Sequence, residues 1–259
     1  MAEIPAAYPA VATREDWLAA RKKLLARERE VTHLRDAVNA ERKRLPMVKV
    51  EKDYRFEGPD GEVRLVDMFE GRSQLYIHHF MWLDDIDAGC PSCTVAGDLQ
   101  FNEQSLGLLN GRDLTVACVS RAPYASIARY RDSHGWTFPW YSSNDNDFTY
   151  DFQATLDPAR KPIEYNYLSL DELHERGFTD DQLRGDQPGA SVFLRRGDEV
   201  FHTYSAYSRG LDHASVGYPF LDLTPYGRQE AWEDAPAGWP QDGLAGGVPR
   251  DETEAEACH

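Results

Sequence analysis

The chain has 259 residues, of which 41% are hydrophobic and 12% aromatic, and this composition is sufficient for a packed core. Its formal net charge of −16 argues against nucleic acid or an anionic membrane surface as a partner, because like charges repel. No apolar run approaches the roughly 20 residues of a membrane span, and residues 1–12 lack the basic and apolar regions of a secretory signal. Only four cysteines are present, too few for a disulfide framework, so we expect a cytoplasmic location.

Residues 13–46 are predicted to form one long amphipathic helix, after a flexible N-terminus at residues 1–12. Thr13 is a favourable N-cap, and Pro46 ends the segment. Other faces of the helix are basic, which indicates either a solvated surface or a surface that docks on an acidic partner protomer. A seven-residue stripe predicts packing against the chain's own domain or a homodimer through residues 13–45. The stripe consists of Trp17, Leu24, Val31, Val38 and Leu45.

Residues 47–228 are predicted to form a single α/β domain. A short β region with a Gly58–Gly61 turn comes first. An alternation of strands and helices then predicts a parallel sheet with right-handed crossovers. The strands are expected at 74–81, 114–120 and 136–142, and the helices at 91–109 and 123–134.

A hairpin that turns at Arg196-Gly197-Asp198 follows a less regular stretch with a helix at 169–176. Parallel strands followed by an antiparallel hairpin are the thioredoxin order. The predicted fold class is therefore a thioredoxin-like mixed sheet flanked by helices. Residues 229–259 are acidic and rich in Gly and Pro, and they are predicted to be a disordered tail.

The motif Cys90-Pro91-Ser92-Cys93 lies between a predicted strand and a predicted helix. In a reducing compartment this placement is typical of a thioredoxin-like redox motif. The helix N-terminus stabilises a thiolate on the first cysteine, and Pro91 suits the first helical position. Cys90 is therefore the expected attacking thiol and Cys93 the resolving thiol. The nearby aspartates oppose a thiolate; they are Asp84, Asp85 and Asp87.

A metal site is the alternative interpretation of the same motif. Cys118 lies in a predicted buried strand and Cys258 in the tail, so a four-cysteine zinc site is disfavoured. Two thiolates and an imidazole would instead suit copper or zinc. Adjacent strand residues face opposite ways, so only one of His78 and His79 can face the dithiol. The alternative metal ligands are Cys90, Cys93, His79 and His202, whereas the main interpretation needs no cofactor.

Further residues are candidates for a substrate pocket beside the dithiol. Arg209 could hold a carboxylate or balance a thiolate, and Tyr204 lies in the same polar segment. Trp136 could wall a pocket, although core packing is the alternative. Pro188 precedes the hairpin, near the position where this fold commonly places a cis-proline that faces the dithiol.

Seven short stretches of the chain resemble a known family, the domain-of-unknown-function 899 family, over residues 13–225. That family is described as thioredoxin-like and as predicted dithiol-disulfide oxidoreductases. The resemblance implies that Cys90 and Cys93 form the site and that His79, Trp136 and His202 belong to the family pattern. One departure is Thr94-Val95-Ala96-Gly97, where relatives tend to have a serine and bulky aromatics. The stretches are His79-Phe80-Met81, Gly89–Cys93, Val119–Pro123, Gly135–Trp140, Asp147-Phe148, Tyr165-Asn166-Tyr167 and His202–Ser205.

Three functions are consistent with these features. The main hypothesis is a thiol-disulfide oxidoreductase that acts on a small-molecule or protein disulfide and is reduced again by a cellular thiol reductant. The first alternative is a copper or zinc protein. The second is a catalytically inactive thioredoxin fold that serves interaction through the long N-terminal helix.

Overall fold

The computed structural model describes residues 8–241, which fall into two compact units. One unit combines Met1–Pro46 with Leu221–Gly243, and the other contains Met47–Phe220. The candidate site lies wholly in the second unit. Within the part of the chain that the structure describes, no helix has the length and apolar character needed to cross a membrane.

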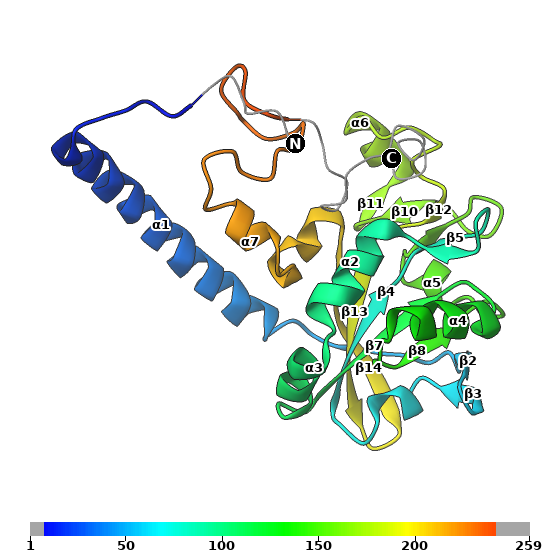
Figure 1. Cartoon of the computed structure of the whole chain (residues 1–259). Coiled ribbons are helices and arrows are strands. Elements are labelled where there is room, and N and C mark those ends of the chain that lie inside the picture. The colour runs from blue at the N-terminus through cyan, green and yellow to red at the C-terminus, as the bar shows by residue number, and fades with distance from the viewer. Residues whose placement is uncertain (1–7, 242–259) are drawn as a thin grey trace. The chain divides into compact units, whose positions relative to one another are not determined.

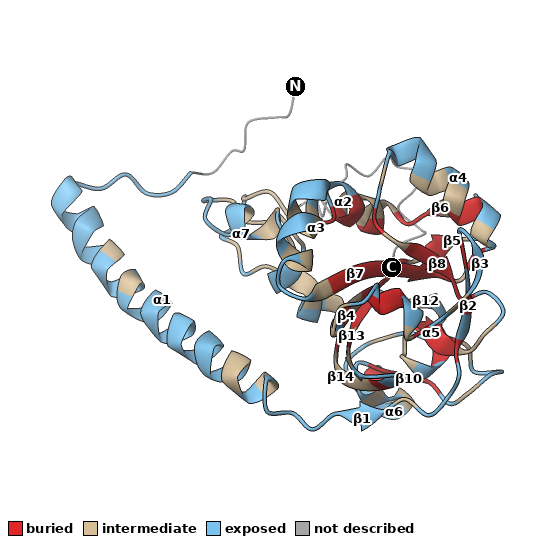
Figure 2. Ribbon diagram, turned by 90° about the horizontal axis from the view of Figure 1, so that it is seen from below, coloured by how far each residue is buried: buried red, intermediate tan, exposed pale blue. Residues whose placement is uncertain are grey.

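The first unit contains helix α1, Arg14–Arg42, as the sequence predicts. Thr13 caps it by accepting a hydrogen bond from the backbone N–H of Asp16. None of the described helix residues is buried, and the seven-residue stripe is exposed along its length (Figure 2). The predicted tail begins in the same unit: residues 229–241 form turns in which Gln241 donates to the carbonyl of Glu233, and residues 242–259 lie outside the described part.

The second unit is built on an eight-stranded sheet with the order β1-β14-β13-β4-β7-β8-β2-β3. Strand β4 runs parallel to β7, β7 runs parallel to β8, and the β13–β14 hairpin is antiparallel to β4 (Figure 1). The order β14-β13-β4-β7 with these directions is thioredoxin-like, so the predicted fold class is confirmed. The strands of this sheet are β1 Val48–Lys49, β2 Arg55–Gly58, β3 Gly61–Arg64, β4 Gln74–His79, β7 Leu114–Ser120, β8 Trp140–Ser142, β13 Gly189–Arg196 and β14 Glu199–Tyr207.

Helices and short hairpins cover the two faces of this sheet. Helices α2, α3 and α4 lie on one face, and α5 and α6 lie on the other (Figure 2). The helices are α2 Pro91–Gln100, α3 Glu103–Asn110, α4 Tyr124–His134, α5 Phe148–Asp151, α6 Leu170–Glu175 and α7 Tyr218–Leu221. The remaining pairs are β5 Trp82–Leu83 with β6 Ala88–Gly89, β9 Thr155–Leu156 with β12 Gly185–Asp186, and β10 Glu164–Tyr165 with β11 Leu168–Ser169; the 3-10 turns are η1 Asp67–Phe69 and η2 Ser208–Ala214.

The single helix predicted at 91–109 is two helices, α2 and α3. Asn102 breaks it, because its side chain caps α3 by accepting from the backbone N–H of Ser105. The predicted strand 136–142 is shorter at its start, since β8 begins at Trp140. The helix expected at 169–176 is α6, which starts with a complete capping box between Ser169 and Glu172.

Two separate clusters of buried side chains fill the two faces of the sheet. One contains Leu75 and Ile77 of β4 together with Phe148 and Phe193. The other contains both cysteines of the motif, Phe80 and a set of aromatic residues that includes Trp140. Alternate residues of β4 therefore point into different cores, and this division decides which side chains can reach the dithiol.

Candidate active site

The Cys-x-x-Cys motif lies where the chain passes from the end of β4, through the β5–β6 hairpin, into helix α2. Cys90 is the N-cap residue of α2, and Pro91 takes the first helical position, where its missing N–H leaves no donor unsatisfied. The backbone N–H of Cys90 donates to the carbonyl of Met81 at 3.0 Å. The first thiol is thereby held at the helix N-terminus, next to the end of the central parallel strand.

The two thiols lie within hydrogen-bonding distance of each other and are shielded from solvent. Cys90 is 1% exposed and Cys93 is 4% exposed, and both are free thiols. The hydrogen bond with Cys90, together with burial, raises the pKa of Cys93 well above its usual value. Cys93 therefore holds its proton, and its S–H is available to donate to the Cys90 sulfur.

Polar contacts fix the turn that carries Cys90. The hydroxyl of Thr94 donates to the Cys90 carbonyl at 3.0 Å and also hydrogen-bonds the Tyr130 hydroxyl at 2.8 Å. Gly89, the residue before the motif, has no room for a side chain, because a Cβ there would lie 2.6 Å from the Phe80 ring. Close packing therefore holds the backbone on both sides of Cys90.

Trp136 packs onto the helix that carries the dithiol. A Cβ at Gly97 would lie 2.7 Å from the Trp136 ring, and the indole N–H donates to Asp98 at 2.7 Å. The absence of a side chain at Gly97 thus provides the space for this ring. Among the described residues, Trp136 is the one predicted pocket residue in the apolar cluster around the thiols.

The other predicted pocket residues lie on the β13–β14 hairpin and its flanks. Tyr204 is on β14 opposite Val192, and Arg209 follows in η2, where it pairs with Asp212 at 3.4 Å. Pro188 lies directly before β13 and has a trans peptide bond, like every described residue; its carbonyl accepts from the Tyr165 hydroxyl at 3.0 Å. Pro188 and the start of η2 therefore lie at the end of the sheet where β4 ends, because Gly189 pairs with both His79 and Tyr207. Tyr204 lies further along β14, away from that end.

His78 and not His79 is the histidine on the dithiol face. The His78 ring packs against Phe80 and Phe101, and the charge of Cys90 acts on it. Burial lowers the pKa of His78 to about 4, so the ring is neutral at physiological pH. The expectation that His79 adjoins the dithiol is wrong, because adjacent strand residues face opposite sides of the sheet.

His79 belongs to a buried polar chain on the opposite face. Its Nε2 is 2.8 Å from the Ser191 hydroxyl, which is 2.8 Å from the Ser205 hydroxyl, which is 2.8 Å from His202 Nε2. Burial lowers the pKa of His79 to about 3. The chain therefore links three adjacent strands, β4, β13 and β14, through neutral hydrogen bonds.

The alternative set of metal ligands is consequently not assembled. Cys90 and Cys93 lie on one face of the sheet, whereas His79 and His202 lie on the other. Within residues 8–241 no three His, Cys, Asp or Glu side chains gather in a geometry that could hold a metal ion. Cys118 is on the dithiol face but is an inert core thiol, since burial raises its pKa well above the usual value.

The aspartates before the motif are directed outward. Asp87 pairs with Arg129 of α4 at 2.5 Å and accepts from Ser126 at 3.1 Å. An ion-paired carboxylate opposes a thiolate less than a free one does. The expected negative influence on the dithiol is therefore reduced for this residue.

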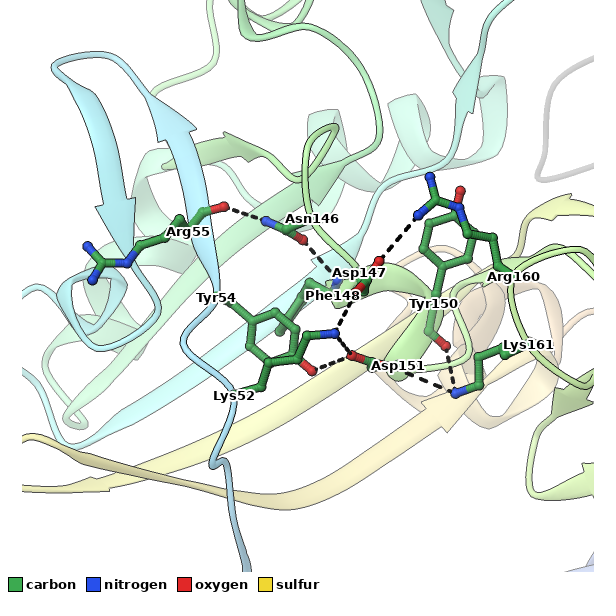
Figure 3. Close-up of polar contacts among 10 residues, drawn as sticks. All are labelled: Lys52, Tyr54, Arg55, Asn146, Asp147, Phe148, Tyr150, Asp151, Arg160 and Lys161. Carbon is green, nitrogen blue, oxygen red and sulfur yellow. Dashed lines mark hydrogen bonds and ion pairs between the residues drawn. The ribbon is translucent and has the colours of Figure 1, made fainter.

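Asp147-Phe148, another stretch that resembles the family, has a structural role on the face of the sheet that holds His79. Asp147 pairs with Lys52 at 2.6 Å and with Arg160 at 3.4 Å, and Lys52 also reaches Asp151 at 2.9 Å (Figure 3). These ion pairs attach α5 to the segment before β2. Phe148 is then held in the core with its ring centroid 5.8 Å from that of His79.

Polar residues that the sequence did not single out meet at the carboxyl ends of β4 and β7. Arg121 and Thr149 line a narrow, partly open cavity together with His79 and Asp186. Ligands of α/β proteins commonly bind outside the carboxyl ends of parallel strands. A charged residue directly after a buried parallel strand, as in Ser120-Arg121, was the available sequence signal.

This fold and site define a thioredoxin-like protein with a buried Cys-x-x-Cys dithiol. The chain belongs to the family described as bacterial protein of unknown function, DUF899, whose model matches residues 6–243. No curated protein matches the sequence.

Solved structures that are similar include proteins named as peroxiredoxins. The bacterioferritin comigratory protein of Xanthomonas campestris, described for its alkyl peroxide reduction activity, is 13% identical with a TM-score of 0.45 and aligns with 66% of this chain and 92% of its own. The peroxidoxin BcpB of Mycobacterium tuberculosis is 11% identical with a TM-score of 0.44, covering 66% of this chain and 92% of its own. A peroxiredoxin-like protein of Aquifex aeolicus is 13% identical with a TM-score of 0.37, covering 63% and 80%.

Proposed function

We propose that the protein is a dithiol-disulfide oxidoreductase in which Cys90 attacks a disulfide and Cys93 resolves the mixed disulfide. The observation that carries this proposal is the hydrogen-bonded pair of free thiols at the N-terminus of α2. A thiolate at that position is favoured by the positive end of the helix dipole and by the proton that Cys93 keeps. Cys118, the third described cysteine, is isolated in β7 and has neither feature.

The reaction transfers two electrons from the dithiol to the substrate. The Cys90 thiolate attacks one sulfur of the substrate disulfide, the S–S bond breaks, and the first product thiolate leaves. That product takes the proton of Cys93, and the Cys93 thiolate then attacks the Cys90 sulfur. The second product thiolate leaves and is protonated by solvent. The protein ends with a Cys90–Cys93 disulfide, which a cellular thiol reductant converts back to the dithiol.

Burial of both sulfurs favours small disulfides over folded protein disulfides as substrates. With Cys90 1% exposed, a substrate sulfur must enter the protein instead of meeting the thiol at the surface. The surrounding aromatic cluster excludes water and provides apolar contact for such a substrate. A reducing compartment such as the cytoplasm would keep the dithiol in its reduced form.

The test is turnover of a small disulfide coupled to a thiol reductant. Cys90→Ser should abolish turnover, and Cys93→Ser should accumulate the mixed disulfide, visible by mass spectrometry of the intact protein. Cys118→Ala is the matched control, because it removes a buried thiol of the same cluster and should leave turnover within about twofold. Unchanged turnover in Cys90→Ser would overturn the proposal.

A further inference from the structure

The narrow cavity at the carboxyl ends of β4 and β7 is lined by polar atoms that no protein group satisfies. His79 Nδ1, Arg121 Nε and Thr149 Oγ1 are all buried and have no hydrogen-bond partner among the described residues. Buried polar atoms without partners are few in native proteins, so three at one cavity require an explanation. Such a concentration of donors is typical of a binding site for a polar group.

Arg121 gives the cavity its charge. Its guanidinium lies over the Tyr150 ring, 4.9 Å from the centroid, which fixes its plane. Among the described residues no carboxylate forms an ion pair with it, and its buried Nε has no hydrogen-bond partner. Asp186 lines the same cavity, and its carboxylate is already engaged by the Thr155 hydroxyl at 2.7 Å and the Trp82 N–H at 3.1 Å. Arg121 is therefore a half-buried cation with a buried Nε, and its planar donors remain available to an anion.

Only one short segment of backbone separates the cavity from the dithiol. Met81 lines the cavity, its carbonyl accepts from the Cys90 N–H at 3.0 Å, and its backbone also hydrogen-bonds Cys93. The next residue, Trp82, donates its N–H to Asp186 on the cavity wall. The cavity and the dithiol are therefore in contact with the same backbone segment, Met81-Trp82.

The size of the cavity limits the ligand. Its empty space is about 160 Å³ including the part open to solvent, and in this conformation its walls leave no gap that would admit a water molecule. A group that binds there must be small and must part the walls, and a charge-assisted bidentate bond with Arg121 is the interaction that would do so. A carboxylate has both the size and the planar shape for this contact.

We propose that Arg121 and Thr149 bind the carboxylate of a small, carboxylate-bearing disulfide and so place its sulfur against Cys90. Arg121 donates its paired N–H groups to the two carboxylate oxygens, and Thr149 donates its hydroxyl. This specificity rests on the proposed dithiol function, and the same binding site is predicted to exist whether or not the dithiol turns over.

Paired substrates test the specificity. Dithiodipropionate carries a carboxylate on each arm, and hydroxyethyl disulfide is a neutral counterpart of similar length. In Arg121→Gln we expect KM for dithiodipropionate to rise about tenfold or more, the loss of one charged hydrogen-bonded contact, while KM for hydroxyethyl disulfide stays within about twofold. Arg121→Lys should retain part of the preference, because the charge remains but the planar fork is lost.

The matched control is Arg160→Gln. Arg160 also lies over the Tyr150 ring, at 5.0 Å, but it is 56% exposed and pairs with Asp147. It should leave both KM values unchanged. Equal rises for the two substrates in Arg121→Gln, or no rise for either, would overturn the proposal.

A binding measurement separates this inference from the proposed function. Propionate has the carboxylate but no sulfur, so its binding does not need the dithiol chemistry. Propionate should raise the thermal midpoint of the wild type and of Cys90→Ser, and should have no effect on Arg121→Gln beyond that of chloride at equal ionic strength. A shift that is the same in all three proteins would contradict the carboxylate site even if the dithiol were active.

Discussion

Strand β4 carries two adjacent histidines, His78 and His79, which lie in different environments on opposite faces of the sheet. His78 lies among aromatic rings beside the dithiol, and its buried Nε2 has no partner among the described residues. His79 lies on the other face and is the end of a hydrogen-bonded chain through two serines to His202. The dithiol face thus surrounds the sulfurs with apolar groups, whereas the other face combines an apolar cluster with a polar chain that ties three strands together.

Lowering the pH should have the largest effect on the free energy of unfolding, because both histidines of β4 are buried in the neutral form. Burial lowers the pKa values of His78 to about 4 and of His79 to about 3, from 6.5 in the unfolded chain. The unfolded state therefore binds more protons below pH 6.5, so their contribution to stability is present above that pH and is lost as the pH falls. At pH 5 the loss is on the order of 2 kcal/mol for each histidine.

Denaturant unfolding between pH 7 and pH 5 measures this dependence. His78→Leu and His79→Leu should each reduce the slope markedly, because each deletes a buried histidine whose pKa is lowered. Part of the slope should remain in both variants, since burial also lowers the pKa of His202. A slope that neither substitution reduces would show that other groups control the acid sensitivity.

The packing of Trp136 on α2 provides the next test of the dithiol face. Gly97→Ala should cost about 1–3 kcal/mol, because the new methyl overlaps the Trp136 ring. Gly107→Ala in α3 is the control: its added Cβ meets nothing within 4 Å, and the helix should gain about 0.5–1 kcal/mol. Thermal unfolding with tryptophan fluorescence measures both variants. If Gly97→Ala were as stable as Gly107→Ala, Trp136 would not be held as described.

The smallest expected effect is the difference in stability cost between replacing His79 and replacing His78 at neutral pH. His79→Leu should cost about 1 kcal/mol, since it removes the hydrogen bond to Ser191. His78→Leu should be close to neutral, because it replaces a ring whose Nε2 is unsatisfied with an apolar side chain in an apolar cluster. Urea midpoints at pH 8 provide the comparison. The reverse order of costs would contradict the assignment of the two faces.

The periodicity of the sequence predicted the fold because each element has a local signal. The strand-helix alternation, the turn at Arg196-Gly197-Asp198 and the cap at Thr13 are all read from short stretches and agree with the structure. The split of the predicted helix 91–109 depends on one residue, Asn102, which caps α3 through a local hydrogen bond from the Ser105 N–H. An asparagine inside the predicted helix was therefore an available local signal.

The candidate site was predictable only in its covalent core. Cys90 and Cys93 are three residues apart in the chain, so their proximity follows from spacing. Which of His78 and His79 faces them depends on strand register, which a single sequence does not fix. The cavity is lined by Arg121, Thr149 and Asp186, which come from three separate segments of the chain. Their proximity depends on tertiary packing and could not be predicted from local sequence patterns.

The central claim is that Cys90 and Cys93 form a redox-active pair, and intact-protein mass spectrometry tests it most directly. The reduced protein would be treated with a limiting amount of a small disulfide and alkylated under denaturing conditions. The account predicts that Cys90 and Cys93 together lose two hydrogens and escape alkylation, while Cys118 is alkylated in full. Stable attachment of the small thiol to Cys90 with Cys93 still alkylated, or no oxidation of either, would contradict it.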